Sequence, residues 1–304
     1  MPQEPSPGPP PDLLVVVGPT ASGKTALAVR LAEELGGEIV SADSVQVYRH
    51  IDVGTGKPTA EERARAPHHL IDVREPLEPM DAAEWAALAG RAISDIRSRG
   101  RVAIVCGGTF LWVRALLYGL APAPPADAAV RTRHRAVVEA EGRAALHEQL
   151  RAVDAASAGR LSPNDFVRVS RALEVYELTG KPMSEWQAAH GFREARHRAR
   201  LVGIRLSSEA LSQRIAARVN TMLAAGWVEE VRGLLEAGLG EARALGSVGY
   251  RQVIRAIQAG PIDETALAAE IVRATRVFAR RQRTWLRDRP VEWLEPEEAR
   301  RFRP

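Results

Sequence analysis

The chain has 304 residues, of which 45% are hydrophobic and 26% charged, and its formal net charge is +4 at pH 7. This composition supports a sizeable buried core and excludes a largely disordered chain. Apolar runs such as residues 13–17 are far too short to cross a bilayer, and the first residues carry no basic patch leading into a hydrophobic segment. The single cysteine, Cys106, allows no internal disulfide. We therefore expect a cytoplasmic protein with no export signal and no membrane contact.

The basic residues are almost all arginine. Among 42 lysines and arginines, only Lys24, Lys57 and Lys181 are lysine. An excess of cations makes an anionic partner plausible, because clustered positive charge attracts phosphate backbones. A lysine kept in such an arginine-rich chain is a candidate for a role that needs a compact ammonium group, and Lys24 is the foremost candidate.

Residues 1–12 are rich in proline and show no hydrophobic period, which predicts a disordered tail. Short runs rich in β-branched residues follow, separated by helical patterns: strands at 13–17, 38–42, 102–106 and 201–206, with helices at 25–35 and 81–100. This alternation is typical of βαβ units on a buried parallel sheet. The sequence therefore predicts an α/β fold with a doubly wound parallel sheet.

A proline-rich break at residues 121–126 predicts a linker. From there to residue 198 the pattern is helical without a convincing strand. A helix start is predicted at residues 162–165, with Ser162 as the cap and Asp165 facing the helix dipole, and this helix should end at Gly180. We expect a helical insertion domain at 121–198 that interrupts a core made of residues 13–120 and 199–304.

Residues 18–25 read GPTASGKT, follow a predicted buried strand and open a predicted helix. The pattern G-x-x-x-x-G-K-[ST] in that context is typical of a phosphate-binding loop, in which backbone amides and the helix N-terminus hold phosphate. Lys24 should meet phosphate oxygens, and Thr25 should place its hydroxyl on Mg2+. The predicted phosphate-binding residues are Gly18, Pro19, Thr20, Ala21, Ser22, Gly23, Lys24 and Thr25. A glycine-rich turn that binds nothing is the alternative.

A second feature separates this loop from that of an ATPase. An ATPase of this class usually has an aspartate at the end of a further buried strand, to hold the metal and order water. Here the strand at 102–106 runs into Gly107, Gly108 and Thr109 without an acid, whereas Asp43 follows the strand at 38–42. Strand ends of such sheets share one crevice, so Asp43 should face the loop. This arrangement favours group transfer over hydrolysis; a role for Asp43 in capping the next turn is the alternative.

Eight blocks along the chain match one family in order: 18–25, 41–58, 67–73, 107–120, 160–182, the region of Arg214 and Arg218, 246–252 and 274–287. The chain resembles the tRNA dimethylallyltransferases, which transfer an isopentenyl group from dimethylallyl diphosphate to the N6 amine of the adenosine at tRNA position 37, beside the anticodon. The resemblance covers about residues 13–294. It implies a P-loop NTPase-like core with an all-helical insertion domain.

The resemblance implies roles for the catalytic residues. Residues 18–25 would hold the diphosphate of the donor, with pyrophosphate as the leaving group. Lys24, Mg2+ at Thr25, and Arg214 or Arg218 would stabilise its charge. Asp43 matches the catalytic aspartate, which would orient the adenine amine and accept its proton.

The resemblance also implies contacts with the tRNA anticodon stem-loop, whose target base must leave the stack to react. The matching positions are Asp43, Ser44, Val45, Gln46, Thr109, Arg131, Val167, Arg168, Val169, Ser170 and Arg171. Val167 departs from the family pattern, where glutamine is frequent, and Gly56 replaces the commoner alanine. A solvated helix face is the alternative for Arg168 and Arg171.

A basic stripe is predicted near the C-terminus, where Arg276, Arg280, Arg283 and Arg287 recur at spacings of four, three and four. The opposite, apolar face is predicted to contain Ile271, Ala274, Phe278 and Trp285. Because no glutamate interleaves the stripe, we expect Arg276, Arg280 and Arg283 to contact RNA phosphate, with a merely solvated face as the alternative.

Several other residues suggest chemistry less strongly. His68, His69 and Cys106 lack the ligand spacing of a zinc site. Trp112 and Tyr118 could line an isoprenoid pocket, although core packing is the commoner role. Two other functions remain open: a small-molecule P-loop kinase, and an RNA-binding module whose loop only senses nucleotide. No pattern demands a protein partner, so we expect a monomer.

Overall fold

The computed structural model describes residues 12–304, so nearly all of the predicted tail lies outside the described residues. The chain divides into two compact units. Unit 1 contains the residues up to Leu117 together with Arg196–Pro304, and unit 2 is Tyr118–Ala195. The sequence analysis places these boundaries about three residues later, at 121 and 198. Among the described helices, none has an apolar stretch long enough to cross a bilayer.

Unit 1 is built on a six-stranded sheet in which every pair of neighbours is parallel. Its strands are β1 Leu13–Val17, β2 Glu38–Ala42, β3 His68–His69, β4 Ala103–Gly107, β5 Ala199–Ile204 and β6 Val291–Leu294. Their order is β3-β2-β4-β1-β5-β6. The chain therefore builds the sheet first on one side of β1 and then on the other. Such a switch in strand order opens a crevice at the carboxyl ends of the strands, where ligands bind.

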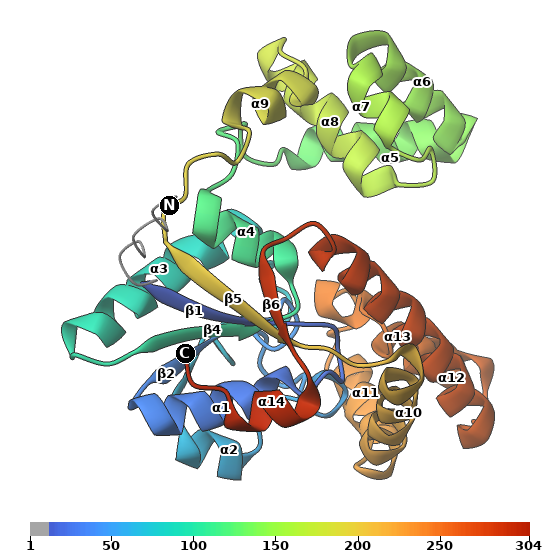
Figure 1. The fold of residues 1–304 in the computed structure, drawn as a ribbon. Helices are drawn as coiled ribbons and strands as arrows, with labels where there is room; N and C mark the ends of the chain where they lie inside the picture. Colours follow the sequence, from blue (N-terminus) through green and yellow to red (C-terminus); the bar gives the residue numbers. More distant parts are fainter. Residues whose placement is uncertain (1–11) are drawn as a thin grey trace, which may run out of the picture. The chain divides into compact units, whose positions relative to one another are not determined.

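Helices cover both faces of this sheet, which explains why every residue of β1, β2 and β4 is buried. Figure 1 shows α1 (Lys24–Leu35) and α14 (Pro296–Arg301) on one face, and α3 (Ala82–Ser98) and α4 (Phe110–Tyr118) on the other. The α2 helix (Ala60–Arg65) follows a short 3-10 turn, η1 (Val53–Thr55).

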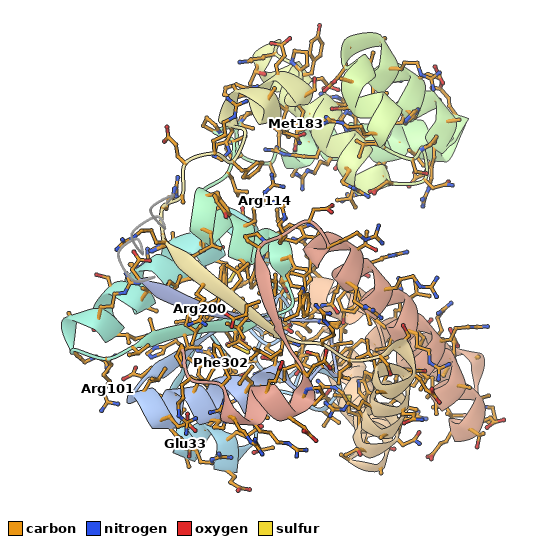
Figure 2. The ribbon with its side chains drawn as sticks, in the orientation of Figure 1. Glu33, Arg101, Arg114, Met183, Arg200 and Phe302 are labelled. Carbon is orange, nitrogen blue, oxygen red and sulfur yellow. The ribbon has the colours of Figure 1, made fainter. Side chains whose placement is uncertain are left out.

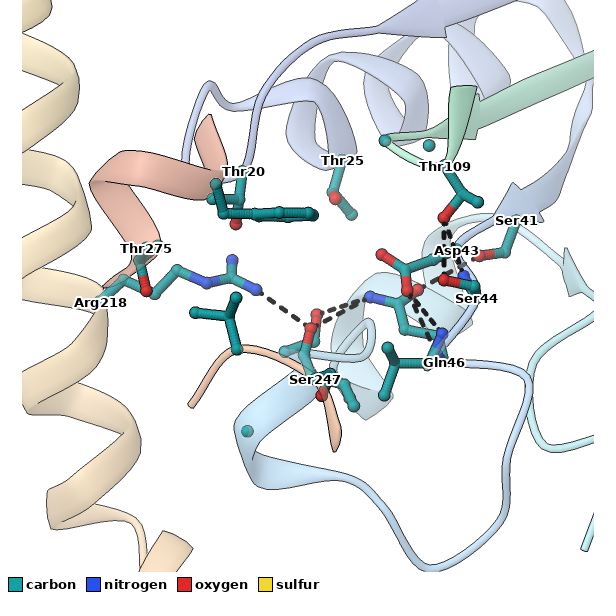
Figure 3. A pocket seen from close by; sticks show the side chains of 18 of the residues that line it. Thr20, Thr25, Ser41, Asp43, Ser44, Gln46, Thr109, Arg218, Ser247 and Thr275 are labelled. Atoms are coloured by element: carbon teal, nitrogen blue, oxygen red, sulfur yellow. Dashed lines mark hydrogen bonds between the residues drawn. The ribbon is translucent and has the colours of Figure 1, made fainter. Parts of the chain in front are cut away.

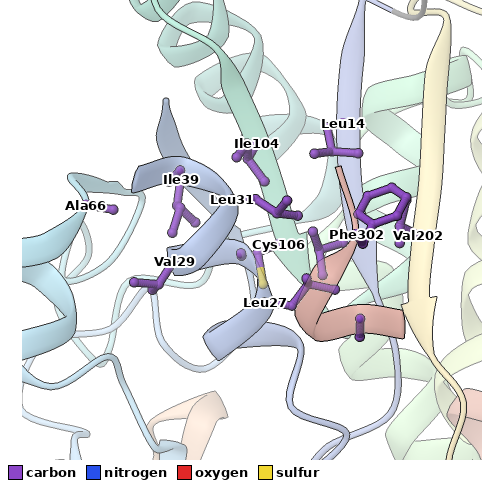
Figure 4. Close-up of a cluster of buried hydrophobic side chains, with 14 of the residues drawn as sticks. Leu14, Leu27, Val29, Leu31, Ile39, Ala66, Ile104, Cys106, Val202 and Phe302 are labelled. Carbon is purple, nitrogen blue, oxygen red and sulfur yellow. The ribbon is translucent and has the colours of Figure 1, made fainter. Parts of the chain in front are cut away.

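The first face is a continuous apolar layer (Figure 4), in which side chains of β1 and β4 pack against α1. Phe302, just after α14, closes the layer, and the Arg200 guanidinium lies 5.0 Å from the centre of its ring (Figure 2). On the other face Trp85 of α3 stacks on Trp112 of α4, with ring centroids 5.2 Å apart. The Trp85 indole N–H donates to the Ser41 carbonyl, which satisfies the one polar group of that buried ring.

The C-terminal helices of unit 1 gather at one end of the sheet (Figure 1). They are α10 Ser208–Ala224, α11 Trp227–Glu236, α12 Tyr250–Ala259 and α13 Glu264–Leu286, with a 3-10 turn, η2 (Arg243–Gly246), before α12. Helices α10 and α13 pack along each other, and α12 packs on both α11 and α13. This group of helices extends the wall of the crevice beyond the strand ends.

Unit 2 is helical throughout its regular elements, as predicted: α5 Ala128–Glu141, α6 Arg143–Val153, α7 Ala155–Arg160, α8 Phe166–Thr179 and α9 Met183–His190. A separate apolar cluster holds it together, with Leu146 and Leu150 of α6 against Val169 and Leu173 of α8. Buried His134 joins two helices, because its ring nitrogens pair with the Ser170 hydroxyl and the Glu177 carboxylate.

The structure confirms the α/β class and the parallel sheet, and four predicted strands correspond to β1, β2, β4 and β5. Two strands are not predicted: β3 has only two residues, and β6 (VEWL) contains a charged residue at the sheet edge. The predicted cap of α8 is wrong in detail. Asp165 is the N-cap and accepts from the Arg168 N–H, whereas the Ser162 hydroxyl accepts from Asn164 N and closes a turn before the helix. Gly180 ends α8 with a φ of 68°, as expected for a left-handed glycine cap.

Candidate functional site

A cavity of about 370 Å³ lies where the strands of unit 1 end. Its wall includes the phosphate-binding loop after β1, the turn after β2, the turn after β4, and side chains of α10 and α13 (Figure 3). This is the place that the strand order predicts. The structure therefore brings together the loop at 18–25, Asp43, Thr109 and Arg218, which are far apart in the sequence.

The phosphate-binding loop closes over the N-terminus of α1. Gly23 has a φ of 93°, in the left-handed region that favours glycine, and a Cβ added there would lie 3.3 Å from the Arg214 guanidinium, a tight contact. The next residue, Lys24, begins the helix. This geometry directs the free amides of the first turn towards the cavity, which is the arrangement that binds anions.

Two cations of the cavity lack an acidic partner. Within residues 12–304, neither Lys24 nor Arg218 forms a salt bridge. Burial lowers the pKa of Lys24 and of Arg218, because a charge away from water is less stable; the nearby negative charge of Asp43 acts in the opposite direction on both. Arg218 donates one hydrogen bond, to the Thr55 carbonyl at 3.1 Å. Two half-buried cations that form no salt bridge with a described carboxylate provide a place for an anion.

The structure separates Arg214 from Arg218. Arg218 lines the cavity, whereas Arg214 does not and instead approaches the Ser22 carbonyl, at 3.4 Å. Of the two candidates, only Arg218 lines the cavity, whereas the guanidinium of Arg214 contacts the backbone of the phosphate-binding loop.

Asp43 directly follows β2, and its side chain lines the cavity (Figure 3). Its Oδ1 accepts from the backbone N–H groups of Val45 and Gln46, at 2.9 and 3.4 Å. Its Oδ2 has no hydrogen-bond partner in the described part of the chain. One oxygen of this carboxylate therefore caps the turn, as the alternative interpretation predicts, and fixes the group, while the other accepts no hydrogen bond from the described residues.

The predicted RNA-contact residues next to Asp43 are tied to one another. Ser44 N–H donates to the Thr109 hydroxyl at 3.0 Å, which links the turns after β2 and β4. The Gln46 amide accepts from the Ser41 hydroxyl at 3.2 Å and donates to the carbonyls of Thr55 and Gly56. Val45 lines the cavity beside them. The polar groups of this wall are therefore held in fixed orientations.

Several cavity residues are missed by sequence reasoning. Gln282 of α13 is buried and bridges two turns: its Oε1 accepts from the Thr20 N–H at 2.9 Å, and its Nε2 donates to the Gly108 carbonyl at 3.0 Å. Arg281 and Phe278 of the same helix also line the cavity. The prediction that Phe278 belongs to an apolar base is wrong, since 40% of its surface is exposed. Residues 275, 278 and 282 share a third face of α13. The sequence analysis considered only the basic and the apolar face of this helix and therefore missed it.

The basic stripe itself faces away from this cavity. Arg276, Arg280, Arg283 and Arg287 line a groove between α13 and α10, to which no described acidic residue contributes. Arg283 donates to the Ser208 hydroxyl at 2.9 Å. The structure thus places the four arginines together on a surface groove, as a helical face predicts, but on a different side of α13 from the residues of the cavity.

In unit 2 the predicted RNA-contact residues fall into two groups. Val167 is 70% exposed, and the Arg168 side chain is 71% exposed beside Asp165. Val169 and Ser170, in contrast, are only 1% and 2% exposed, because they pack into the interior of the unit. The predicted RNA contact does not fit the side chains of these two residues.

Arg131 and Arg171 are also partly exposed, and both pair with one fully buried carboxylate, Glu174. Arg131 does so with two hydrogen bonds, of 2.9 and 3.0 Å. The hydrogen bonds from both guanidinium groups outweigh burial and hold the pKa of Glu174 below its usual value. Sequence reasoning missed Glu174, although its position three residues after Arg171 on a predicted helix is the spacing of an ion pair.

The less certain aromatic candidates belong to the packing. Trp112 is buried against Trp85, and neither Trp112 nor Tyr118 lines the cavity. His68 does line it; its Nδ1 pairs with the Ala66 carbonyl at 2.8 Å, and burial lowers its pKa, which favours the neutral ring. His69 pairs with the Glu38 carboxylate at 2.7 Å.

Comparison with known proteins identifies relatives over nearly the whole chain. The family model described as IPP transferase matches residues 46–289. A tRNA dimethylallyltransferase from Sorangium cellulosum is 62% identical over 290 residues, covering 95% of this chain and 91% of the relative, and one from Geobacter sulfurreducens is 47% identical over 285 residues, covering 93% and 91%.

Solved structures agree with these relatives. The full-length tRNA isopentenylpyrophosphate transferase from Bacillus halodurans superimposes with a TM-score of 0.69 at 34% identity, covering 94% of this chain and 90% of that one. A eukaryotic dimethylallyltransferase, described as acting on tRNA, gives a TM-score of 0.74 at 25% identity, covering 93% and 73%. These matches confirm the resemblance found in the sequence blocks. The chain belongs to the IPP transferase family.

Proposed function

We propose that this protein transfers a dimethylallyl group from dimethylallyl diphosphate to the N6 amine of the adenosine at tRNA position 37, 3' of the anticodon, with release of pyrophosphate. The observation that carries the proposal is the cavity at the strand ends. It holds two half-buried cations, Lys24 and Arg218, and the Asp43 carboxylate; among the described residues neither cation forms a salt bridge, and one Asp43 oxygen accepts no hydrogen bond. An anionic leaving group needs the cations, and a weakly basic amine needs the carboxylate.

The diphosphate end of the donor is held by the amides of residues 18–25, by the Lys24 ammonium and by the Arg218 guanidinium. The allylic C–O bond breaks and its electron pair leaves with pyrophosphate, whose growing charge these groups stabilise. The N6 nitrogen forms the new bond to that carbon, and its surplus proton passes to Asp43 Oδ2. Because Oδ1 is already occupied by two backbone N–H groups, the orientation of Asp43 does not change during the transfer.

Mg2+ fits this site as a partner of the donor. The cation usually keeps several waters and binds one or two protein oxygens together with substrate phosphates. Thr25 lines the cavity at the start of α1 and can supply its hydroxyl oxygen. When bound, Mg2+ would neutralise part of the diphosphate charge.

We assign the tRNA contacts to three groups of residues. Ser44, Val45, Gln46 and Thr109 surround the position of the reacting base, which must be extruded from its stack. Arg276, Arg280 and Arg283 offer an uncompensated cationic groove for RNA phosphate. Val167 and Arg168 are exposed on unit 2, and Arg131 and Arg171, which both pair with Glu174, are partly exposed on the same unit. We also propose that the protein acts as a monomer in the cytoplasm.

The test is mass spectrometry of nucleosides after the protein is mixed with unmodified tRNA and dimethylallyl diphosphate labelled in its carbon chain. The expected product is a labelled dimethylallyl adenosine at position 37, with pyrophosphate released in equal amount. A parallel reaction with γ-labelled ATP and small acceptors tests phosphoryl transfer. Label in a phosphorylated small acceptor, with none in tRNA, would establish the kinase alternative; RNA binding without either product would leave only a binding module.

A further inference from the structure

We propose that Glu230 is a positioning residue for the anion-binding end of the cavity, acting through the 3-10 turn η1 on Arg218 and Gln46. This inference rests on the proposed function, because it concerns the same donor site. Glu230 lies in the first turn of α11 and does not line the cavity. Its effect must therefore pass through the residues that it holds.

The Glu230 carboxylate fixes the start of η1. Its Oε2 accepts from the backbone N–H groups of Asp52 and Val53, at 2.8 and 2.7 Å. Its Oε1 accepts from the Tyr250 hydroxyl at 2.6 Å, and that hydroxyl accepts in turn from the Gly54 N–H at 3.0 Å. Three consecutive amides of the turn are thus held by one carboxylate and one phenol that belong to other helices. Hydrogen bonds to a charged group are among the stronger ones in proteins.

Trp227 fixes the same turn by shape. Its indole occupies the space that side chains would need on both neighbours: a Cβ added to Gly54 would lie 2.0 Å from Nε1, and one added to Gly249 would lie 2.1 Å from the far edge of the ring. The ring also meets Tyr250 edge-on, with centroids 5.5 Å apart. The turn is therefore seated on α11 and α12 in one position.

The far side of the turn holds two cavity residues. The Thr55 carbonyl accepts from Arg218 at 3.1 Å and from the Gln46 amide at 3.3 Å, and the Gly56 carbonyl accepts from Gln46 at 3.1 Å. Figure 3 shows these bonds converging from Arg218 and Gln46 on the same turn. Since Arg218 has no other hydrogen bond in the described residues, the position of Thr55 decides where its guanidinium points.

The consequence is a chain of contacts that begins at Glu230 and ends at the groups that meet the diphosphate and the base. Without Glu230, the amides of Asp52 and Val53 lose their acceptor and Tyr250 loses its own. The turn can then move, and Arg218 loses the carbonyl that pre-orients it. A pre-oriented guanidinium binds phosphate more tightly, because less side-chain freedom is lost on binding.

The experiment measures the affinity of inorganic pyrophosphate by calorimetry for the full chain and for Glu230→Ala, Glu230→Gln and Tyr250→Phe. The matched control is Glu229→Gln, one residue earlier in the same helix turn, where the side chain is exposed and has no described partner. We expect Glu230→Ala to weaken pyrophosphate binding about tenfold. Glu230→Gln keeps an amide oxygen for the two backbone N–H groups and should lose at most about threefold, as should Tyr250→Phe, which retains the ring packing. Glu229→Gln should bind as the unchanged protein does.

A double-mutant cycle separates positioning from general destabilisation. In an Arg218→Ala background, Glu230→Gln should have no further effect on pyrophosphate affinity, because the residue through which it acts is gone. Equal pyrophosphate binding by Glu230→Ala and the unchanged protein, or full additivity with Arg218→Ala, would overturn the inference while leaving the proposed function intact. Failure of the unchanged protein to bind pyrophosphate would overturn both.

Discussion

The cations of the cavity and those of unit 2 are held in opposite ways. In unit 1, Lys24 and Arg218 are half-buried and form no salt bridge with any described residue, and burial lowers the pKa of each. In unit 2, Arg131 and Arg171 are partly exposed, yet both pair with the buried carboxylate of Glu174. The first arrangement opposes folding and favours an added anion, whereas the second is already neutralised by the fold.

This contrast distinguishes residues that serve a ligand from residues that serve the structure. A half-buried cation without a described ion-pair partner is a candidate for a ligand contact, because no carboxylate of the described chain compensates its partial loss of water. A pair such as Arg131 and Glu174 needs no ligand to explain it. The exposed edges of Arg131 and Arg171 can still reach an RNA backbone, but Glu174 fixes their orientation in advance.

The largest effect is expected for Arg218→Met. It removes a cation that in the proposed mechanism stabilises the leaving group, so the rate of transfer should fall by about 10² to 10³, which corresponds to roughly 3–4 kcal/mol. Its melting temperature should be equal to or above that of the unchanged protein, because a half-buried charge without a described ion-pair partner is lost. Single-turnover kinetics and thermal unfolding measure the two quantities. Arg214→Met, which loses only a contact to the loop, is the comparison variant and should retain more activity. A strong loss of stability in Arg218→Met would contradict the contrast.

The opposite result is expected for Glu174→Ala. It leaves Arg131 and Arg171 without their shared acceptor in a buried position, which should destabilise unit 2 by about 3 kcal/mol. Hydrogen exchange at α5 and α8 of the full chain measures this, and exchange at β1 and β4 should not change. Glu177→Ala is the control, since this more exposed carboxylate pairs with Arg133 and His134 and should cost less. Equal effects of the two variants would show that burial of Glu174 has no special weight.

The fold could be predicted where one local pattern was enough. The strands β1, β2 and β4 are apolar runs buried on both faces, and the loop at 18–25 has a motif with a fixed spacing. The two missed strands depend on neighbours instead: β3 forms only because residues 68–69 pair with β2, and β6 because it pairs with β5 at the sheet edge. Pairing with a distant segment leaves no period in such short runs.

Part of the candidate site could likewise be predicted from local sequence patterns, and part could not. Lys24, Thr25 and Asp43 follow strands, so their place at the sheet edge comes from topology alone. Gln282 and Glu230 were missed because their roles consist of hydrogen bonds to the backbone of Thr20, Gly108, Asp52 and Val53, which no sequence spacing encodes. The choice between Arg214 and Arg218 likewise depends on the direction of α10 over the cavity, because the two residues are one helical turn apart.

Glu38 is a buried carboxylate of unit 1 that lies outside the cavity. It tests whether paired charges stabilise unit 1 as they are expected to stabilise unit 2. Glu38 is only 3% exposed, and its hydrogen bond to Arg99 holds its pKa at about 2, well below the ordinary 4.5. Because the folded pKa is the lower one, this stabilisation is complete above pH 4.5 and is lost as the pH falls towards 2. Glu38→Gln should remove roughly 2 kcal/mol at neutral pH, less than the full shift because Arg99 is exposed to solvent.

Denaturant unfolding between pH 7 and 3 measures this, and the unchanged and variant proteins should converge in stability towards the acid end. Transfer activity at neutral pH should be retained, because Glu38 lies outside the cavity lining. A constant gap in stability at every pH would mean that the pairing with Arg99 contributes nothing that titrates. Glu38 would then differ from Glu174, whose pairing with Arg131 and Arg171 is expected to stabilise unit 2.

The smallest effect on stability and activity is expected for the groove between α10 and α13. Its arginines form no described salt bridge, like Lys24 and Arg218 of the cavity, and they are exposed to solvent, as Arg131 and Arg171 of unit 2 partly are. An exposed cation keeps its water, so Arg280→Ala should leave the melting temperature unchanged. If Arg280 contacts an RNA phosphate, its loss should weaken tRNA binding by about tenfold or less and reduce the slope of log affinity against log salt by about one, without changing pyrophosphate affinity. Arg232→Ala, an exposed residue of α11 outside both cavities, should alter neither slope nor affinity. An unchanged slope in Arg280→Ala would show that an exposed arginine without an acidic partner does not by itself indicate an RNA contact. Only the half-buried cations Lys24 and Arg218 would then indicate a bound anion.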